Sequence, residues 1–219
     1  METAATVGTA PRPGLRELKK QRTRDALLRA AFRLFTTQGY EQTTVDEIAE
    51  AVDVSQRTFF RYFASKEEAA FFVLRIGESH ILEAVRARPP AEAPFEALRR
   101  AVLESWDALH ETIEQIVPVD LHLRIYQVIE STPALLAAHL RRAAEMEDRL
   151  ACVIAEREGL DVDADPRPRI VVALFGGVIR VAERIWSTGE DLSLEAMREQ
   201  MTRYLDEVGP ALAGNWRTD

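Results

Sequence analysis

Apolar residues recur every three or four positions along most of the chain, and this spacing predicts helices. In the first such segment, Leu28, Phe32 and Phe35 mark one face of a helix that begins near Arg16 and ends at Gly39. No stretch alternates polar and apolar residues in the manner of a half-buried strand. The pattern therefore predicts an all-α fold.

Three further helices are expected after the first one, each with Ser or Thr at its start. Thr44, with Glu47 three positions later, has the sequence of a capping box before a helix of about two turns. Ser55 is placed to cap the next short helix. Ser65 is placed to cap a longer helix, which we expect to continue to Pro89.

The chain contains one convincing linker, Pro89-Pro90 together with Pro94. Beyond it the spacing predicts helices bounded by Pro or Gly, near Phe95–Gln115, Asp120–Glu130, Pro133–Glu158, Arg167–Thr188 and Leu194–Leu212. The expected organisation is a flexible tail over residues 1–14, a small helical domain over 15–66, a connecting helix over 67–90 and a larger helical domain over 91–219.

Two short helices joined by a tight turn, after a longer supporting helix, form the helix-turn-helix pattern, whose second helix enters the major groove of DNA. Here the second helix starts at Gln56, and its apolar residues Phe59 and Phe63 would face inward. The opposite face is polar and basic, so it is suited to reading base edges. We expect this role for Gln56, Arg57, Thr58, Phe60 and Arg61.

Contacts to phosphates would come from donors around that helix, at helix N-termini and on the first helix. The candidates are Thr44, Tyr62, Lys66, Lys19, Lys20 and Arg22. Each has a simpler alternative: Thr44 can be a helix cap, and the lysines and arginine can be solvated surface residues. The turn spacing and the basic residues together favour the DNA-binding interpretation.

The charge is distributed unevenly along the 219 residues. The net charge is −8, but the first 66 residues carry +3 and the remaining 153 carry −11. With 47% hydrophobic and 29% charged residues, the composition is that of a globular protein. The asymmetry suggests that one end binds a polyanion and that the other end has a different task.

Several other classes of protein are disfavoured. The longest apolar run, Ile170–Ile179, is too short to span a membrane, and no secretory signal is visible, so we expect a cytoplasmic protein. The single cysteine, Cys152, lies on an apolar stripe and is expected to be buried. The four histidines lack metal-site spacing, and we find no phosphate-binding loop, so we expect no metal, no cofactor and no enzymatic activity.

Six short motifs lie around the two short helices: Thr43-Thr44-Val45, Ile48-Ala49, Val54-Ser55, Thr58-Phe59, Tyr62-Phe63 and Ser65-Lys66-Glu67. Through these motifs the region over residues 20–75 resembles the DNA-binding domain of TetR-family regulators. Three positions depart from the pattern: Asp53 stands where the turn often has Gly, Arg57 stands where Gly or Pro is frequent, and Phe60 replaces a common Tyr. Asp tolerates the positive φ of the turn, whereas Phe60 lacks a hydroxyl for a phosphate contact.

The resemblance implies that the C-terminal half dimerises through its last two long helices and holds an effector pocket. Gly176-Gly177 inside an apolar helix favours close packing, for which a second chain is one explanation. The stripe Leu194, Met197, Met201, Leu205 and Val208 could pair with its symmetry mate, the alternative being a core within one chain.

For a pocket we expect apolar and aromatic residues at helical spacing in the C-terminal half. The candidates are Trp106, Leu109, His110, Ile113, Leu123, Tyr126, Ile129, Met146, Phe175 and Ile179. The polar residues His122, Arg124, Arg180 and Glu183 would be unusual if buried, and a ligand would explain them. Ala87-Arg88-Pro89, Thr132–Leu135 and Trp186 also resemble the ligand domain of mycofactocin-type regulators, which implies a hydrophobic effector such as an acyl thioester.

These observations predict a homodimeric DNA-binding regulator, a repressor that binds a palindromic double-stranded operator and leaves it when a small molecule binds. The alternative is a ligand-binding or scaffold protein that keeps the helical fold without reading DNA.

Overall fold

The computed structural model describes residues 14–214, and within this range it contains helices and no strand. Apart from Gly14, the tail expected over residues 1–14 lies outside the described residues. The helices are α1 (Leu15–Thr37), α2 (Val45–Glu50), α3 (Gln56–Phe60), α4 (Lys66–Ala70), α5 (Phe72–Ala87), α6 (Pro94–Glu104), α7 (Trp106–Glu114), α8 (Val119–Ser131), α9 (Pro133–Glu158), α10 (Arg167–Ser187), α11 (Leu194–Asp206) and α12 (Val208–Ala213). The all-α prediction is confirmed.

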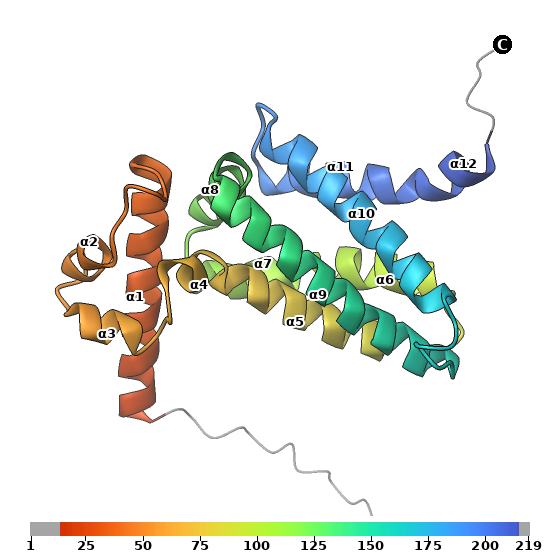
Figure 1. Cartoon of the computed structure of the whole chain (residues 1–219), viewed down its shortest axis with the longest axis horizontal. Helices are drawn as coiled ribbons and strands as arrows, with labels where there is room; N and C mark the ends of the chain where they lie inside the picture. The colour runs from red at the N-terminus through yellow and green to blue at the C-terminus, as the bar shows by residue number, and fades with distance from the viewer. Residues whose placement is uncertain (1–13, 215–219) are drawn as a thin grey trace, which may run out of the picture.

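The first three helices and the start of α4 form a head at one end of the molecule, and the remaining helices form a larger bundle beside it (Figure 1). In the bundle α5 packs against α9, and α10 lies between α9 and α11. Helix α4 and the start of α5 lie where the head meets the bundle. This placement puts a short chain segment between the two parts.

Three helices that we expected to be continuous are interrupted. The helix after Ser65 breaks at Phe71, whose side chain is buried at the corner between α4 and α5. The helix from Phe95 breaks at Ser105, a residue with modest helix propensity. The last helix breaks at Glu207 because Pro210, four residues after Asp206, lacks an N–H and its ring clashes with a preceding carbonyl.

The core of the head is rich in phenylalanine and extends into the bundle. Phe32, Phe35, Phe59 and Phe63 are essentially inaccessible to solvent. The same cluster continues through residues of α7, α8 and α9, because α1 packs against α8. The expected boundary near residue 66 therefore separates two structural units that share packed side chains, and the assignment of domains stays a prediction.

A second core fills the far part of the bundle, and it corrects two expectations about the last helices. Met197, Met201 and Leu205 on α11 are buried against their own chain rather than left open for a partner. A side chain at Gly176 would collide with the Glu147 carboxylate, so the space at this glycine is used within the chain. The apolar periodicity on α11 is therefore that of an internal core.

One further expectation about the bundle was wrong. Cys152 on α9 is exposed, whereas its neighbours Ala151 and Val153 are buried. The Cys152 thiol therefore lies on a face of α9 that is turned to solvent rather than to the core.

Candidate DNA-binding face and effector cavity

The recognition helix α3 is held by one cap, one strained turn residue and two buried aromatic rings. The Ser55 hydroxyl accepts a hydrogen bond from the Thr58 N–H at 3.3 Å. Asp53, in the turn before it, has φ of 54°, a backbone conformation that Asp tolerates better than most residues. Phe59 and Phe63 are buried with ring centroids 5.4 Å apart, as the sequence predicted. The helix is therefore fixed by its inner face.

The outer face of α3 is free of the rest of the chain. Gln56, Arg57 and Arg61 are exposed, and Phe60 retains 49% of its accessible surface. Thr58 is half-buried, and its hydroxyl lies 3.0 Å from that of Ser55. Arg61 lies over the Tyr62 ring at 5.1 Å. Four of the five residues predicted for base contacts thus share one exposed surface, and Thr58 lies at its edge.

The capping box predicted before α2 is present. The Thr44 hydroxyl accepts from the Glu47 N–H at 3.2 Å, and the Glu47 carboxylate accepts from the Thr44 N–H at 2.8 Å. The hydrogen bonds that the Glu47 carboxylate accepts from the Thr44 N–H, the Thr44 hydroxyl and the Gln38 amide lower its pKa. Thr44 remains exposed, so its role as a cap does not hide it from a phosphate.

Lys66 is engaged by its own chain, which the sequence did not indicate. Its Nζ donates to the carbonyl oxygens of Tyr40 at 2.8 Å and Thr43 at 3.1 Å, and it lies 4.2 Å from the centroid of the Tyr40 ring. An ammonium with these partners is not a free phosphate-binding group. The expectation that Lys66 contacts DNA is replaced by a structural role: it ties the start of α4 to the turn before α2.

The other predicted phosphate-binding residues lie on the surface of the head. Lys19, Lys20 and Arg22 are exposed on α1, and Lys20 lies 3.6 Å from Glu17. Tyr62 is half-buried beside Arg61. Whether these residues contact DNA stays a prediction.

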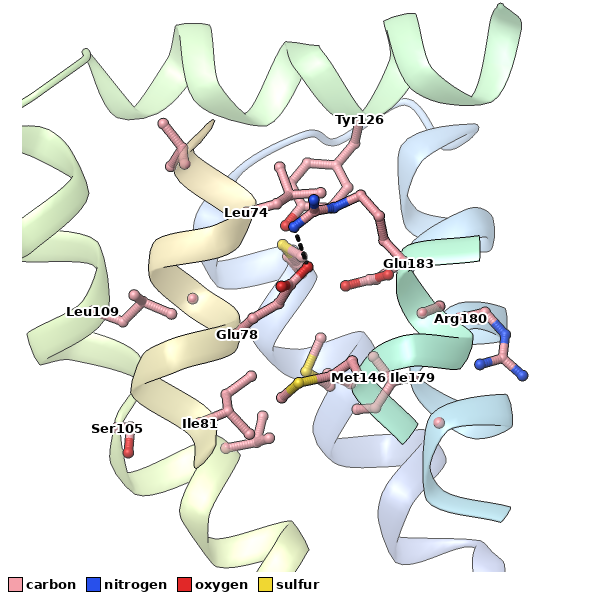
Figure 2. Close-up of a pocket in the computed structure, with 18 of the residues that line it drawn as sticks. Leu74, Glu78, Ile81, Ser105, Leu109, Tyr126, Met146, Ile179, Arg180 and Glu183 are labelled. Atoms are coloured by element: carbon pink, nitrogen blue, oxygen red, sulfur yellow. Dashed lines mark hydrogen bonds and ion pairs between the residues drawn. The ribbon is translucent and has the colours of Figure 1, made fainter. Parts of the chain in front are cut away.

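The bundle contains a cavity of about 200 Å³ enclosed by α5, α6, α7, α8, α9, α10 and α11 (Figure 2). Eight of the ten apolar and aromatic residues predicted for a pocket line it: Trp106, Leu109, His110, Ile113, Tyr126, Met146, Phe175 and Ile179. Leu123 does not line it, because its side chain is buried in the second core, and Ile129 belongs to the first core. Of the four polar candidates, His122, Arg180 and Glu183 line the cavity, whereas Arg124 is exposed.

Charged residues also line the cavity, and of these the sequence singled out Arg180 and Glu183 but not Glu78, Arg142 or Glu147. Glu78 on α5 accepts from Arg142 Nη2 at 2.8 Å and from Arg149 Nη2 at 3.0 Å, both on α9. A second pair joins Arg180 on α10 to Glu147 on α9. Glu78 and Arg142 lie on helices with ordinary amphipathic patterns, so no local signal marked them as partners across the cavity.

Several titratable groups at the cavity are perturbed by burial. Burial lowers the pKa of His122 to about 3, so this imidazole is neutral at physiological pH. Burial, with Glu130 nearby, raises the pKa of Glu183 to about 7. The pKa of the Tyr126 phenol is raised by burial as well. The cavity thus holds polar groups that its interior does not solvate.

Some of these buried polar groups lack hydrogen-bond partners. In the described part of the chain the unpaired buried side-chain atoms are Trp106 Nε1, His122 Nδ1, Arg142 Nε and Arg157 Nε. The first three belong to residues that line the cavity. An unpaired buried donor or acceptor costs about 1–3 kcal/mol, and a bound ligand is one means of satisfying it.

Among residues 14–214, no helix is both long and apolar enough to cross a membrane.

Comparison with known proteins assigns both parts of the chain. Residues 27–69 match the family model described as "Bacterial regulatory proteins, tetR family", and residues 92–210 match the "MftR C-terminal domain". The "HTH-type transcriptional regulator TcmR" of Streptomyces glaucescens is 45% identical over 216 residues, which cover 99% of this chain and 96% of that protein. The MftR protein of Mycobacterium tuberculosis is 30% identical over 187 residues, covering 83% of this chain and 87% of its own.

Solved structures agree on the fold. A transcriptional regulator from Aquifex aeolicus has a TM-score of 0.54 at 16% identity, over 85% of this chain and 99% of its own. A second structure is NalD of Pseudomonas aeruginosa, the secondary repressor of the MexAB-OprM multidrug efflux pump. It has a TM-score of 0.53 at 20% identity, over 85% of this chain and 97% of its own. The head, the helical bundle and the relatives that match nearly the whole chain lead to one assignment: this protein belongs to the TetR family of transcriptional regulators.

Proposed function

We propose that the protein is a repressor that binds a palindromic operator as a homodimer and releases it when a small hydrophobic effector occupies the cavity. The observation that carries the proposal is the recognition helix α3, which buries Phe59 and leaves Gln56, Arg57 and Arg61 exposed on one surface. A side-chain set of this kind offers donors for guanine and adenine edges in the major groove. Such a regulator acts where the DNA lies, which we take to be the cytoplasm.

Within this interface, the base contacts are assigned to Gln56, Arg57, Thr58, Phe60 and Arg61. Arg57 suits a bidentate bond to guanine, Gln56 suits adenine, and the exposed Phe60 ring suits a thymine methyl group. Phosphate contacts are assigned to Thr44, Tyr62, Lys19, Lys20 and Arg22, which surround α3 on the head or extend along α1.

The partner in the homodimer would pack on α10 rather than on the buried stripe of α11. Ile170 and Ile185 on α10 retain 62% and 42% of their accessible surface. Ala173 is exposed on the same helix, and Gly177 and Val181 between them are half-buried. An exposed apolar helix face with a small residue at its centre suits close packing against a two-fold mate. Such a dimer would place its two α3 helices at operator half-sites about one turn of DNA apart.

Effector binding is supported by the size and chemistry of the cavity. Its volume of about 200 Å³ is below that of most ligand sites, so a bound molecule would have to move the surrounding helices. A ligand shifts an equilibrium only if it binds one conformation better than the other, and a cavity that must widen meets this condition. The resemblance to mycofactocin-type regulators implies a hydrophobic effector, with an acyl thioester as one example, and the apolar lining of the cavity suits the hydrophobic part of such a molecule.

The connection from the cavity to the DNA would run through Glu78, Arg142 and Phe71. Arg142 binds Glu78 in the cavity wall and also lies over the Phe71 ring at 5.4 Å. Phe71 ends α4 and begins α5, and its ring is stacked on His139 at 6.3 Å. A ligand that draws Arg142 or Glu78 away would therefore loosen the junction that leads to the head.

The proposal is tested by selecting bound duplexes from a random pool with the purified protein and with a variant carrying Gln56→Ala and Arg57→Ala. We expect the native protein to enrich a palindrome and the variant to lose it, while both keep the same unfolding temperature. If the native protein, refolded free of any bound molecule, enriches no sequence, the alternative of a ligand-binding or scaffold protein without DNA readout is correct.

A further inference from the structure

One carboxyl group at the cavity lacks the cationic partner that the other two have. Glu78 binds two arginines and Glu147 binds Arg180. Glu183 on α10 has one ion-pair partner among the described residues, His139 Nε2 at 4.0 Å. Burial and the charge of Arg142 lower the pKa of that histidine, which favours its neutral form. The lining therefore has three carboxyl groups and two guanidinium groups.

The Glu183 carboxyl group is directed into the cavity. In Figure 2 its side chain extends from α10 towards Glu78 and Tyr126, while Arg180 points away from this end. Its side chain keeps 17% of its accessible surface although it lies inside the bundle, which agrees with a group that lines a hollow. The carboxyl group is thus open to a molecule in the cavity and poorly solvated by the protein.

From this geometry we infer that the effector is an apolar molecule bearing a protonated amine, and that Glu183 is the residue that binds the amine. The apolar part of such a molecule would lie against Ile81, Met146 and Ile179, which face the same hollow. A cation beside Glu183 would stabilise the carboxylate, whose ionisation is disfavoured by burial and by Glu130 and is only partly favoured by Arg180. The bond formed would be a charge-assisted hydrogen bond from ammonium to carboxylate.

An anionic effector is disfavoured by the same arrangement. Arg142 and Arg180 each already bind a carboxylate, so an anionic ligand would have to break an existing pair. Three lining residues have a buried atom without a partner. Arg142 Nε belongs to a guanidinium that is already paired with Glu78, whereas Trp106 Nε1 and His122 Nδ1 are neutral and could serve polar atoms on the body of the ligand.

This inference rests on the proposed role of the cavity, and it is tested by ligand binding without DNA. The probes are three matched naphthalenes: 1-naphthylmethylamine, 1-naphthalenemethanol and 1-naphthoate. Isothermal titration of the full chain at pH 7.5 would give their dissociation constants. We expect the amine to bind about tenfold or more tightly than the alcohol, the value of one charge-assisted hydrogen bond, and the carboxylate to bind most weakly.

Two variants distinguish Glu183 from its surroundings. Glu183→Gln keeps the shape and a hydrogen-bonding group, and it should abolish the preference for the amine while leaving the alcohol bound as before. Glu147→Gln removes a carboxylate of the same cavity wall, one that is already paired with Arg180, and it should keep the preference.

Two results would overturn the inference while leaving operator binding intact: an amine that binds no more tightly than the alcohol, or a preference that persists in Glu183→Gln. Binding of none of the three probes would overturn both the inference and the role of the cavity as a ligand site, which the duplex selection does not test.

Discussion

The head and the effector cavity differ in how completely their polar groups are satisfied. In the head, Lys66 binds carbonyl oxygens, three helix starts carry side-chain caps, and the aromatic rings of the core are packed without solvent access. Among the described residues, four buried side-chain atoms lack a hydrogen-bond partner, and all four belong to the bundle. Three of them are on residues that line the cavity. The polar groups of the head are thus satisfied within the chain, whereas the cavity leaves atoms unpaired that a bound molecule could satisfy.

The largest effect is expected from disturbing the packing of the head. Phe63→Ala removes a fully buried ring that contacts the ring of Phe59. Its centroid lies 5.7 Å from the centroid of the Phe72 ring. It should lower the free energy of unfolding by about 3–5 kcal/mol, because the tight core cannot collapse around the space. Urea unfolding followed by circular dichroism would measure this. A loss below about 1 kcal/mol would mean that the head is as loosely packed as the cavity.

Lys66 offers a second, smaller test of the head. Lys66→Met keeps the length of the side chain but removes its bonds to the Tyr40 and Thr43 carbonyls. We expect a loss of about 1–2 kcal/mol, reduced from the value for a buried charged bond because the group is half-exposed. The salt dependence of operator binding should be unchanged. If Lys66 instead bound a phosphate, the slope against salt would flatten by about one unit.

The perturbed groups of the cavity predict opposite pH dependences. His122 has a folded pKa of about 3, below the ordinary value of 6.5, so its stability contribution is complete above pH 6.5 and is lost as pH falls from there towards 3. Glu183 has a folded pKa of about 7, above the ordinary 4.5, so its contribution is complete below pH 4.5 and is lost as pH rises through 7. Between pH 4.5 and 6.5 the two contributions change in opposite directions, so the unfolding midpoint of the native protein should vary little there. Glu183→Gln leaves only the His122 contribution, so the midpoint of this variant should rise with pH over the same window. A variant with the same pH profile as the native protein would show that Glu183 is not held in its neutral form.

The smallest effect is expected where a polar group has no partner. Trp106→Phe removes the unpaired indole N–H together with part of a ring that faces the cavity. The gain from removing the N–H and the loss of packing should nearly cancel, giving a change in unfolding free energy within about 1 kcal/mol. Differential scanning calorimetry would resolve it. A loss of about 3 kcal/mol or more would indicate that the indole N–H has a bound partner, such as a water molecule, in solution.

The head could be predicted from sequence because its signals are local. Thr44 and Glu47 are three residues apart, Ser55 directly precedes α3, and the positive φ of Asp53 follows from a turn between two short helices. Lys66 escaped prediction because its partners, Tyr40 and Thr43, lie more than twenty residues earlier.

The bundle was predicted less completely because its features depend on contacts between distant helices. Most of the apolar and aromatic candidates do line the cavity, but periodicity alone did not separate Leu123, which is buried in the core, from residues that face the cavity. The pairing of Glu78 with Arg142 joins residues 64 positions apart. The same limit explains the stripe on α11: the pattern shows that one face is buried, but not whether its own chain or a partner buries it.

The most direct test of the account compares Glu78→Gln with Glu147→Gln in operator binding without effector. Both variants remove a carboxylate that pairs with an arginine at the cavity, but only the Glu78 partner, Arg142, also lies over Phe71 at the α4–α5 junction. Using the duplex obtained by selection, we predict that Glu78→Gln weakens operator binding about fivefold or more, while Glu147→Gln changes it less than about twofold. Equal effects of the two variants, or no effect of Glu78→Gln, would contradict the claim that the cavity controls the head through this contact.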